Sequence, residues 1–146
     1  MEAMAKTLLD AQQSGLYQLV RSTEEVERAA TDAGLSVFRI DVGHAHDKKN
    51  FLEGVAQALR FPSWFGKNWD ALTDCLTDLD WLSTKTGYVL VFENGDRFCS
   101  SRNPDFETAK AVLSAAAEYW KVEGRPFWVL IEVSAKSHCN LPKWPI

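Results

Sequence analysis

An uninterrupted apolar stretch, Tyr-Val-Leu-Val-Phe at residues 88–92, constrains the fold of this chain more than any other feature. Its length suits a β-strand, and strands that are buried on both faces have continuous apolar sequences rather than alternating ones. A second stretch of strand character occupies residues 127–133, near the end of the chain. The sequence therefore predicts a sheet in which the strand at residues 88–92 is covered on both faces.

The first part of the chain has the pattern of a strand, a helix and a second strand. Residues 16–20 and 35–42 have strand character, and the second of these segments is rich in β-branched and aromatic side chains. Between them, Ser22 and Glu25 have the spacing of a capping box that begins a helix, and Gly34 suits the end of that helix. This order favours a parallel pair joined by a right-handed crossover. We expect residues 16–20 to form an edge strand beside residues 35–42.

Apolar side chains recur at helical spacing in three later segments, which are residues 48–60, 68–79 and 106–122. Together with the strands, these helices give the order of elements that is typical of an α/β protein. We therefore predict a small, mostly parallel sheet of three to four strands, packed with helices in two layers. No internal repeat or linker divides the 146 residues, so one compact unit is expected.

The charge of the chain argues against nucleic acid as a direct partner. The 16 Lys and Arg residues are outnumbered by 20 Asp and Glu residues, which gives a net charge of −4, whereas nucleic-acid binding needs clustered basic side chains. A basic protein is compatible with this charge. No segment approaches the ~20 apolar residues of a membrane-spanning helix, so no membrane contact is expected.

The chain contains three cysteines, Cys75, Cys99 and Cys139, and no two of them have the spacing of a metal or redox motif. Because the number is odd, we expect no disulfide framework and a reducing compartment. The first residues include Glu2 and no apolar run that would suit a signal peptide. These observations predict a cytoplasmic location.

The sequence lacks the motifs of several large enzyme classes, since it contains no GxxxxGKS, GxxxxGKT, GxGxxG, GxSxG or HExxH pattern. His44, His46 and Asp47 form a polar cluster that could bind a metal, but no further ligands follow at a matching spacing. Asp47 is also well placed to cap the next helix. We therefore predict a protein without catalytic residues, cofactor or metal, and an enzyme or metal protein is the alternative.

The segment at residues 61–79 combines an aromatic turn with a helix that has two different faces. Asn68 is placed as the N-cap of this helix. One face carries Leu72, Cys75, Leu76 and Leu79, and the opposite face carries Asp70, Thr73, Asp74 and Thr77. Asp70 and Asp74, one turn apart, repel each other by about 0.2–0.5 kcal/mol. From the spacing alone, this acidic face is explained either by solvation or by binding.

Residues 59–77 resemble the signature of the barstar family. The shared pattern is a Leu/Phe-Pro turn, two adjacent aromatics at Trp64 and Phe65, the motif Gly66-x-Asn68-x-Asp70-Ala-Leu, and finally Asp74-Cys-Leu-Thr. The match runs without a gap through the whole segment.

The resemblance implies a barstar-like domain at residues 35–133. Residues 1–34 then form an N-terminal extension, a strand and a helix that we expect to pack on the same domain. Residues 134–146 form an irregular C-terminal tail.

For function, the resemblance implies an intracellular, antitoxin-like inhibitor of a barnase-like bacterial ribonuclease. The acidic helix and the aromatic loop would plug the active site of the nuclease, and carboxylates would stand in for RNA phosphates. Asp74 matches the family's principal phosphate mimic, and Cys75 matches a structural cysteine on the buried side. The residues expected to contact the partner are Trp64, Phe65, Gly66, Asn68, Asp70, Thr73, Asp74, Thr77 and Glu118. The partner would be a basic, extracellular-type ribonuclease, and the free inhibitor would be a monomer.

Three positions depart from the best-known member of the family. Thr73 stands where that member has Trp, Tyr119 (next to Glu118) aligns with a glutamate, and Lys67 takes an acidic position. These departures and the extension at residues 1–34 support an alternative hypothesis. In it, the fold serves as an interaction module for a partner that is not a nuclease.

Overall fold

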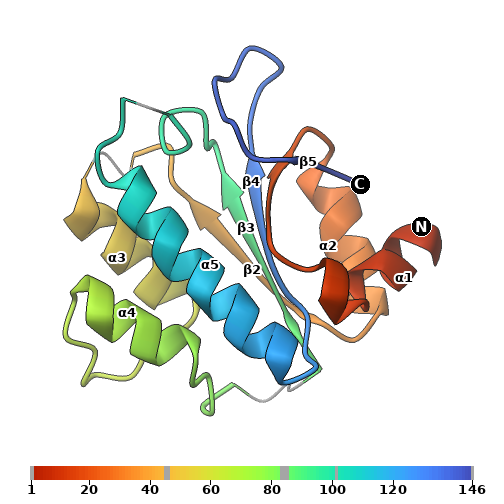
Figure 1. The fold of residues 1–146 in the computed structure, drawn as a ribbon, viewed down its shortest axis with the longest axis horizontal. Helices are drawn as coiled ribbons and strands as arrows, with labels where there is room; N and C mark the ends of the chain where they lie inside the picture. The colour runs from red at the N-terminus through yellow and green to blue at the C-terminus, as the bar shows by residue number, and fades with distance from the viewer. Residues whose placement is uncertain (1, 45–46, 83–85, 101, 146) are drawn as a thin grey trace.

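The structure, a computed structural model, describes residues 2–44, 47–82, 86–100 and 102–145. A five-stranded sheet in the order β2-β3-β4-β1-β5 runs through the described part of the molecule (Figure 1). Its strands are β1 (Leu16–Leu19), β2 (Ser36–Asp41), β3 (Tyr88–Glu93), β4 (Phe127–Glu132) and β5 (Lys143–Trp144). Every neighbouring pair is parallel, which confirms the α/β class expected from the order of elements.

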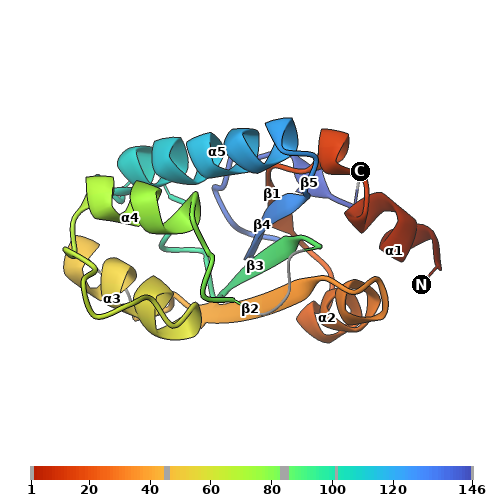
Figure 2. The same ribbon diagram turned by 90° about the horizontal axis from the view of Figure 1, so that it is seen from below.

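Helices cover both faces of this sheet (Figure 2). One face carries α3 (Lys48–Ala58), α4 (Trp69–Leu76) and α5 (Phe106–Val122). The other carries α1 (Glu2–Leu8) and α2 (Thr23–Asp32), and a 3₁₀ turn at Ala11–Gln13 leads from α1 into β1. From β2 onward, the chain thus builds a sheet with one layer of helices, and the N-terminal segment covers the opposite face.

The side chains of β3 explain why both faces are covered. Tyr88, Leu90 and Phe92 point into the core beneath α3, α4 and α5, whereas Val89 and Val91 point into the core beneath α1 and α2. All five side chains are fully buried. The continuous apolar sequence is therefore the consequence of two cores that share one strand.

The position of β1 differs from the sequence expectation. β1 lies between β4 and β5, with Leu16 opposite Val129 and Leu19 opposite Glu132, and not beside β2. The crossover through α2 passes over two strand positions, which β3 and β4 later fill. An alternating or apolar pattern predicts that a segment is a strand, but not which strand it pairs with. The order of the strands in the sheet therefore could not be predicted from the sequence.

The sheet also has one strand more than the three to four that the sequence predicts. The additional strand is β5, two residues of the C-terminal tail, where Trp144 lies opposite Leu19. The Trp144 side chain is fully buried against Trp128, with ring centroids 6.0 Å apart. Two residues are too few to produce a strand pattern in the sequence.

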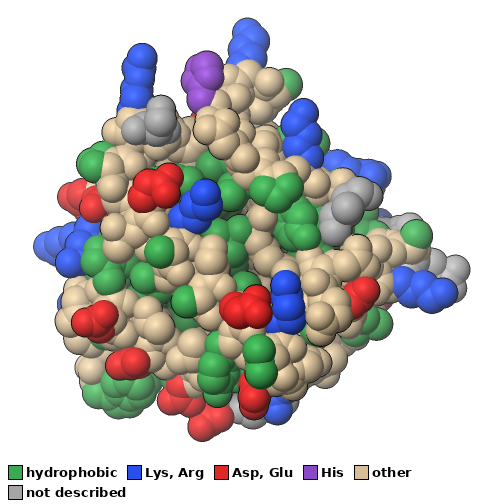
Figure 3. Space-filling view, viewed as in Figure 1, with side chains coloured by type: hydrophobic (Ala, Val, Ile, Leu, Met, Phe, Trp, Pro, Cys, Tyr) green, Lys and Arg blue, Asp and Glu red, His purple; other side chains and the backbone are tan. Residues whose placement is uncertain are grey.

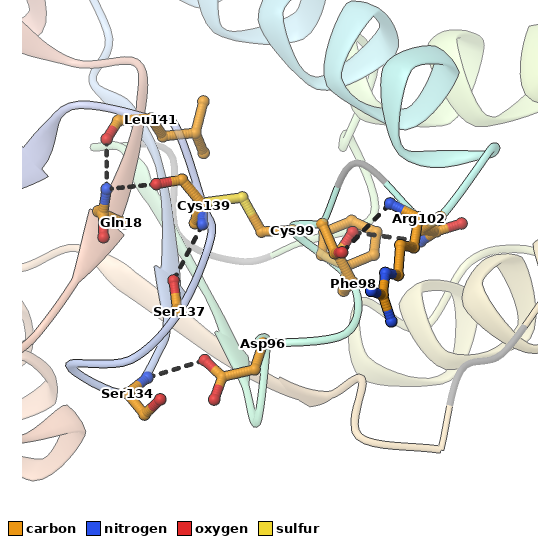
Figure 4. The surroundings of a disulfide bond; sticks show 11 residues. Gln18, Asp96, Phe98, Cys99, Arg102, Ser134, Ser137, Cys139 and Leu141 are labelled. Carbon is orange, nitrogen blue, oxygen red and sulfur yellow. Dashed lines mark hydrogen bonds between the residues drawn. A yellow bond between two sulfur atoms is a disulfide. The ribbon is translucent and has the colours of Figure 1, made fainter.

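A disulfide between Cys99 and Cys139 corrects the expectation that the cysteines are unpaired. It joins the segment after β3 to the C-terminal tail, and the surrounding hydrogen bonds hold the tail against β1 (Figure 4). The Gln18 side chain donates to the carbonyl oxygens of Cys139 and Leu141, at 3.0 and 2.6 Å. Cys75 is the free, buried cysteine that made the number odd.

The expectation of a reducing compartment loses its support with this pairing, because it rested on the absence of a disulfide. None of the helices in the described residues is both long and apolar enough to cross a membrane.

Candidate functional site

The segment that resembles the family signature forms an aromatic loop followed by α4. Asn68 caps the helix as its spacing predicts, since its Oδ1 accepts a hydrogen bond of 2.8 Å from the Ala71 N–H. Gly66 and Asn68 are both exposed, and the Asn68 side-chain amide reaches the Gly66 carbonyl oxygen at 3.5 Å. Lys67 between them is exposed and has a left-handed backbone, with φ of 55°. These contacts hold the loop to the start of the helix.

The inner face of α4 is fixed in the core. Leu72, Cys75 and Leu76 are fully buried, and the Trp120 indole of α5 donates a 2.7 Å hydrogen bond to the Leu76 carbonyl oxygen. Burial raises the pKa of the Cys75 thiol to about 11, with a smaller contribution from the carboxylates of Asp78 and Asp74. Cys75 is thus a structural residue without a reactive thiolate near neutral pH.

The outer face of α4 carries two carboxylates, those of Asp70 and Asp74. Asp70 and Asp74 are exposed, and neither makes an ion pair within the part of the chain that the structure describes. The hydroxyls of Thr73 and Thr77 turn back to the helix and donate to the carbonyl oxygens of Trp69 and Thr73, at 3.2 and 2.8 Å. The two threonines therefore add little polarity of their own, and the surface is dominated by the acids.

Only one of the two adjacent aromatics is presented to solvent. Trp64 is 60% exposed, whereas Phe65 is 9% exposed and packs edge-on against Phe61, with centroids 4.9 Å apart. Phe61 in turn packs against Trp81, whose indole donates to the Leu59 carbonyl oxygen at 2.9 Å. Phe65 supports the loop from below, and Trp64 is the member of the pair whose side chain is open to solvent. The sequence shows two neighbouring aromatics but not which of them the turn directs inward.

A groove of about 420 Å³ lies between α4 and the C-terminal end of α5, beside Asp74. Tyr119, 44% exposed, lines this groove, whereas Glu118 is exposed outside it, 3.9 Å from the Lys121 ammonium. The sequence analysis selected Glu118, the acidic neighbour of Tyr119. In the structure, Tyr119 lines the groove together with Asp74. The groove also contains Asp78, Asp80, Glu123 and Arg125, none of which the sequence analysis selected. In Figure 3, acidic side chains lie along the lower edge of the view, the part of the molecule where Figure 1 shows α4 and the C-terminal end of α5.

The alternative of a metal site at His44, His46 and Asp47, in the loop before α3, gains no support from the described residues. His46 lies outside the described residues, and Asp47 caps α3, since its Oδ1 accepts from the Asn50 N–H at 2.9 Å. Among the described residues, no three His, Cys, Asp or Glu side chains are grouped as a metal site would need.

By its fold and surface, the protein is an α/β domain that presents an acidic helix and an exposed tryptophan on one side of a parallel sheet. The family model described as Barstar (barnase inhibitor) matches residues 35–132, more than half of the chain. The chain therefore belongs to the barstar family. The matched segment begins just before β2 and ends with β4, and it includes α3, α4 and α5.

Solved structures with a similar fold include two of the ORC2 protein of Aeropyrum pernix, titled as ADPNP-ADP complexes and as the ADP form. Each has a TM-score of 0.61 and 17% identity over 91% of this chain. A Walker-type ATPase of Pyrococcus abyssi has a TM-score of 0.51 and 11% identity, again over 91% of this chain. The chain spans only 39–44% of the length of those structures. None of the curated proteins compared with the chain matches it.

At such low identity, the likeness to these three structures concerns the fold alone. The first strand of the chain leads into α2 through Val20, Arg21 and Ser22, and Ser22 itself caps the helix by accepting from the Glu25 N–H at 3.4 Å. This connection contains no glycine, whereas a phosphate-binding loop needs glycines for its close backbone approach.

Proposed function

We propose that this protein inhibits a barnase-like ribonuclease by inserting the outer face of α4 and the Trp64 loop into the nuclease active site. The observation that carries the proposal is the pair Asp70 and Asp74, which are exposed and make no ion pair with any described residue, on a helix whose other face is fully buried. A site that binds RNA phosphates is cationic, and carboxylates form short, charge-assisted hydrogen bonds with such cations.

The rigidity of the helix supports the proposal. The Asn68 cap fixes one end of α4 and the Trp120 indole fixes the other. Because these contacts exist in the free protein, little conformational entropy is lost when Asp70 and Asp74 meet a partner, and less of the binding energy is spent on ordering.

The proposal is tested by measuring RNA cleavage by a panel of barnase-like ribonucleases in the presence of the protein. We expect the wild type to inhibit at least one of them, and Asp74→Asn to weaken that inhibition by about 10- to 100-fold, as expected for a lost hydrogen bond between charged groups. Asp32→Asn is the matched control, because it removes the same charge from α2 on the opposite face. Equal inhibition by wild type and Asp74→Asn would contradict the proposal.

An interaction module with a partner that is not a nuclease is the second candidate. It is favoured by Tyr119, an exposed aromatic residue that lines the groove beside Asp74. Affinity capture with wild type and with Trp64→Ala distinguishes the two, because the partner lost from the variant is either a ribonuclease or another protein. A cytoplasmic location is not part of either proposal, since the disulfide removes the cysteine argument for it.

A further inference from the structure

We propose that a pocket at the carboxyl ends of the parallel strands binds a small zwitterionic molecule, an amino acid whose ammonium and carboxylate lie at opposite ends of a short carbon chain. The pocket has a volume of about 550 Å³ and is formed by the segments that follow β1, β2, β3 and β4. It shares no residue with the outer face of α4 or with the Trp64 loop, so the inference does not depend on the proposed function. Its polar side chains are those of Arg21, Asn94, Asp96, Arg97, Glu132 and Ser134.

The course of the chain explains why a pocket forms at this edge of the sheet. Because neighbouring strands are parallel, their carboxyl ends lie together. From this edge, β1 leads into α2 on one face of the sheet, whereas β3 leads to α5 on the opposite face (Figure 2). β4 lies between these two strands. Connections that leave in opposite directions open a crevice between them, and such crevices are the usual ligand sites of open parallel sheets.

The floor of the pocket is already fixed in the free protein. The turn after β3 packs directly on β4, because a Cβ atom at Gly95 would clash with the Ile131 side chain. The Gly95 N–H donates to the carbonyl oxygen of Glu132 at 2.8 Å. The Asn94 side-chain amide donates to the Asp41 carboxylate at 3.1 Å, which ties the same turn to β2. A site that is ordered before binding loses little conformational entropy when its ligand arrives.

Two carboxylates in the pocket are held by backbone N–H groups of neighbouring strand ends. The Ser134 N–H donates to Oδ1 of Asp96 at 2.8 Å (Figure 4), and the Asn94 N–H donates to Oε1 of Glu132 at 3.1 Å. No described residue donates a hydrogen bond to the second oxygen of either carboxylate. The pair therefore presents positioned acceptors to the ammonium end of a ligand.

A base lines the pocket at the end of β1. The Arg21 guanidinium is 48% exposed and meets the Glu25 carboxylate through Nη2, at 3.0 Å. Its Nε and Nη1 donate to none of the described residues, and a guanidinium fork suits a carboxylate. With Arg97 as the second base, the charges of Asp96 and Glu132 are balanced, so the pocket has a formal charge of zero. A ligand with one charge of each sign matches this balance.

The order of the strands sets the distance between the two charged ends of the ligand. Because β4 lies between β1 and β3, Arg21 stands one to two strand spacings from the two carboxylates, about 5–10 Å. A short carbon chain with a charge at each end spans this distance, whereas the charged groups of glycine share one carbon. Val20, 51% exposed, and Val133 also line the pocket and offer apolar contact to the methylene groups.

The inference is tested on the full chain with 6-aminohexanoic acid as the probe and backbone amide NMR shifts as the readout. We expect saturable shifts at residues 20–21, 94–97 and 132–134, with residues 68–77 unchanged. Hexylamine and hexanoic acid, which each keep one charged end, should bind at least about tenfold more weakly. Glycine should also bind more weakly than 6-aminohexanoic acid.

Two variants assign the two ends of the probe. Arg21→Gln should weaken binding of 6-aminohexanoic acid at least about fivefold and leave hexylamine unaffected, because hexylamine has no carboxylate. Asp96→Asn/Glu132→Gln removes both negative charges but keeps the oxygens that accept from the backbone, and it should weaken every probe that carries an ammonium. Arg28→Gln and Asp32→Asn change exposed charges on α2 outside the pocket and should bind like the wild type.

Three results would overturn the site: no shifts in the pocket, equal binding of a probe with a single charge, or equal binding by Arg21→Gln or by the double variant. Binding of glycine as tight as that of 6-aminohexanoic acid would overturn the spacing of the two charges. Thermal melts show whether each variant is folded. If the double variant is unfolded, the comparison of the four probes on the wild type still decides between the outcomes.

Discussion

The indole nitrogen of Trp120 donates a 2.7 Å hydrogen bond to the carbonyl oxygen of Leu76, the last residue of α4. Both side chains are buried. The last carbonyls of a helix have no partner within the helix, so α5 supplies one to α4 through this contact. This hydrogen bond ties the end of α4 to α5, in addition to the apolar side chains that the two helices bury in one core.

Trp120→Phe should therefore destabilise the protein by about 1–3 kcal/mol, because it leaves the Leu76 carbonyl oxygen buried without a partner. The free energy of unfolding, measured with urea, checks this value. Tyr119→Phe, one residue away on the exposed side of α5, should change stability by less than about 0.5 kcal/mol. Equal stability of Trp120→Phe and wild type would show that the contact contributes nothing.

The sequence could predict those features whose causes are local. Ser22, Asp47 and Asn68 each accept a hydrogen bond from the backbone N–H three residues further on, as the spacing of N-caps requires. The stripe of Leu72, Cys75 and Leu76 is buried because helical periodicity places these residues on one face. The exact end of α4 is a smaller miss. The sequence predicts a helix to residue 79, but α4 ends at Leu76, because the backbone becomes left-handed at Leu79, with φ of 56°.

Features that join distant segments could not be predicted from the same patterns. The pairing of β1 with β4 and β5, and the disulfide between Cys99 and Cys139, are set by the order of the strands. Gln18 illustrates the point: a polar residue in a strand pattern predicts exposure, but it is buried because two tail carbonyls accept from its amide. The groove beside Asp74 likewise exists only because α4 and α5 are neighbours in space.

Removal of the disulfide should lower stability substantially. The bond closes a loop across a sequence separation of 40, and a loop of this length corresponds to about 4 kcal/mol in the chain-entropy model. The double variant Cys99→Ser/Cys139→Ser is compared with wild type by urea unfolding. A reducing agent should lower the stability of the wild type to that of the variant and leave the variant unchanged. If the reductant also destabilises the variant, its effect does not come from this bond.

Asp41 should contribute to the acid sensitivity of the protein. The Asn94 side chain and then the Gly43 N–H donate to its carboxylate and lower its pKa below the usual 3.8. A carboxyl with a lower pKa in the folded state stabilises the fold above the unfolded pKa, and this contribution is lost as the pH falls through the folded pKa.

Asp41→Asn should therefore lose less stability than the wild type when unfolding is measured at pH values falling from about 6 to about 2.5. Asp32→Asn, at a carboxylate without a hydrogen-bond partner in the described residues, should follow the wild-type curve. Parallel curves for Asp41→Asn and wild type would exclude Asp41 as a source of the acid sensitivity.

Asp74→Asn should change stability and binding in opposite directions. Asp70 and Asp74 lie one turn apart on α4, and neither has an ion-pair partner among the described residues. Removing one charge should stabilise the free protein by about 0.2–0.5 kcal/mol, because the repulsion between the two is lost. The same substitution should weaken ribonuclease inhibition, since the carboxylate is then missing from the interface. The stability gain should shrink in about 1 M salt, where charges are screened within about 3 Å. A carboxylate retained only for folding would give the reverse result, a less stable variant with unchanged inhibition.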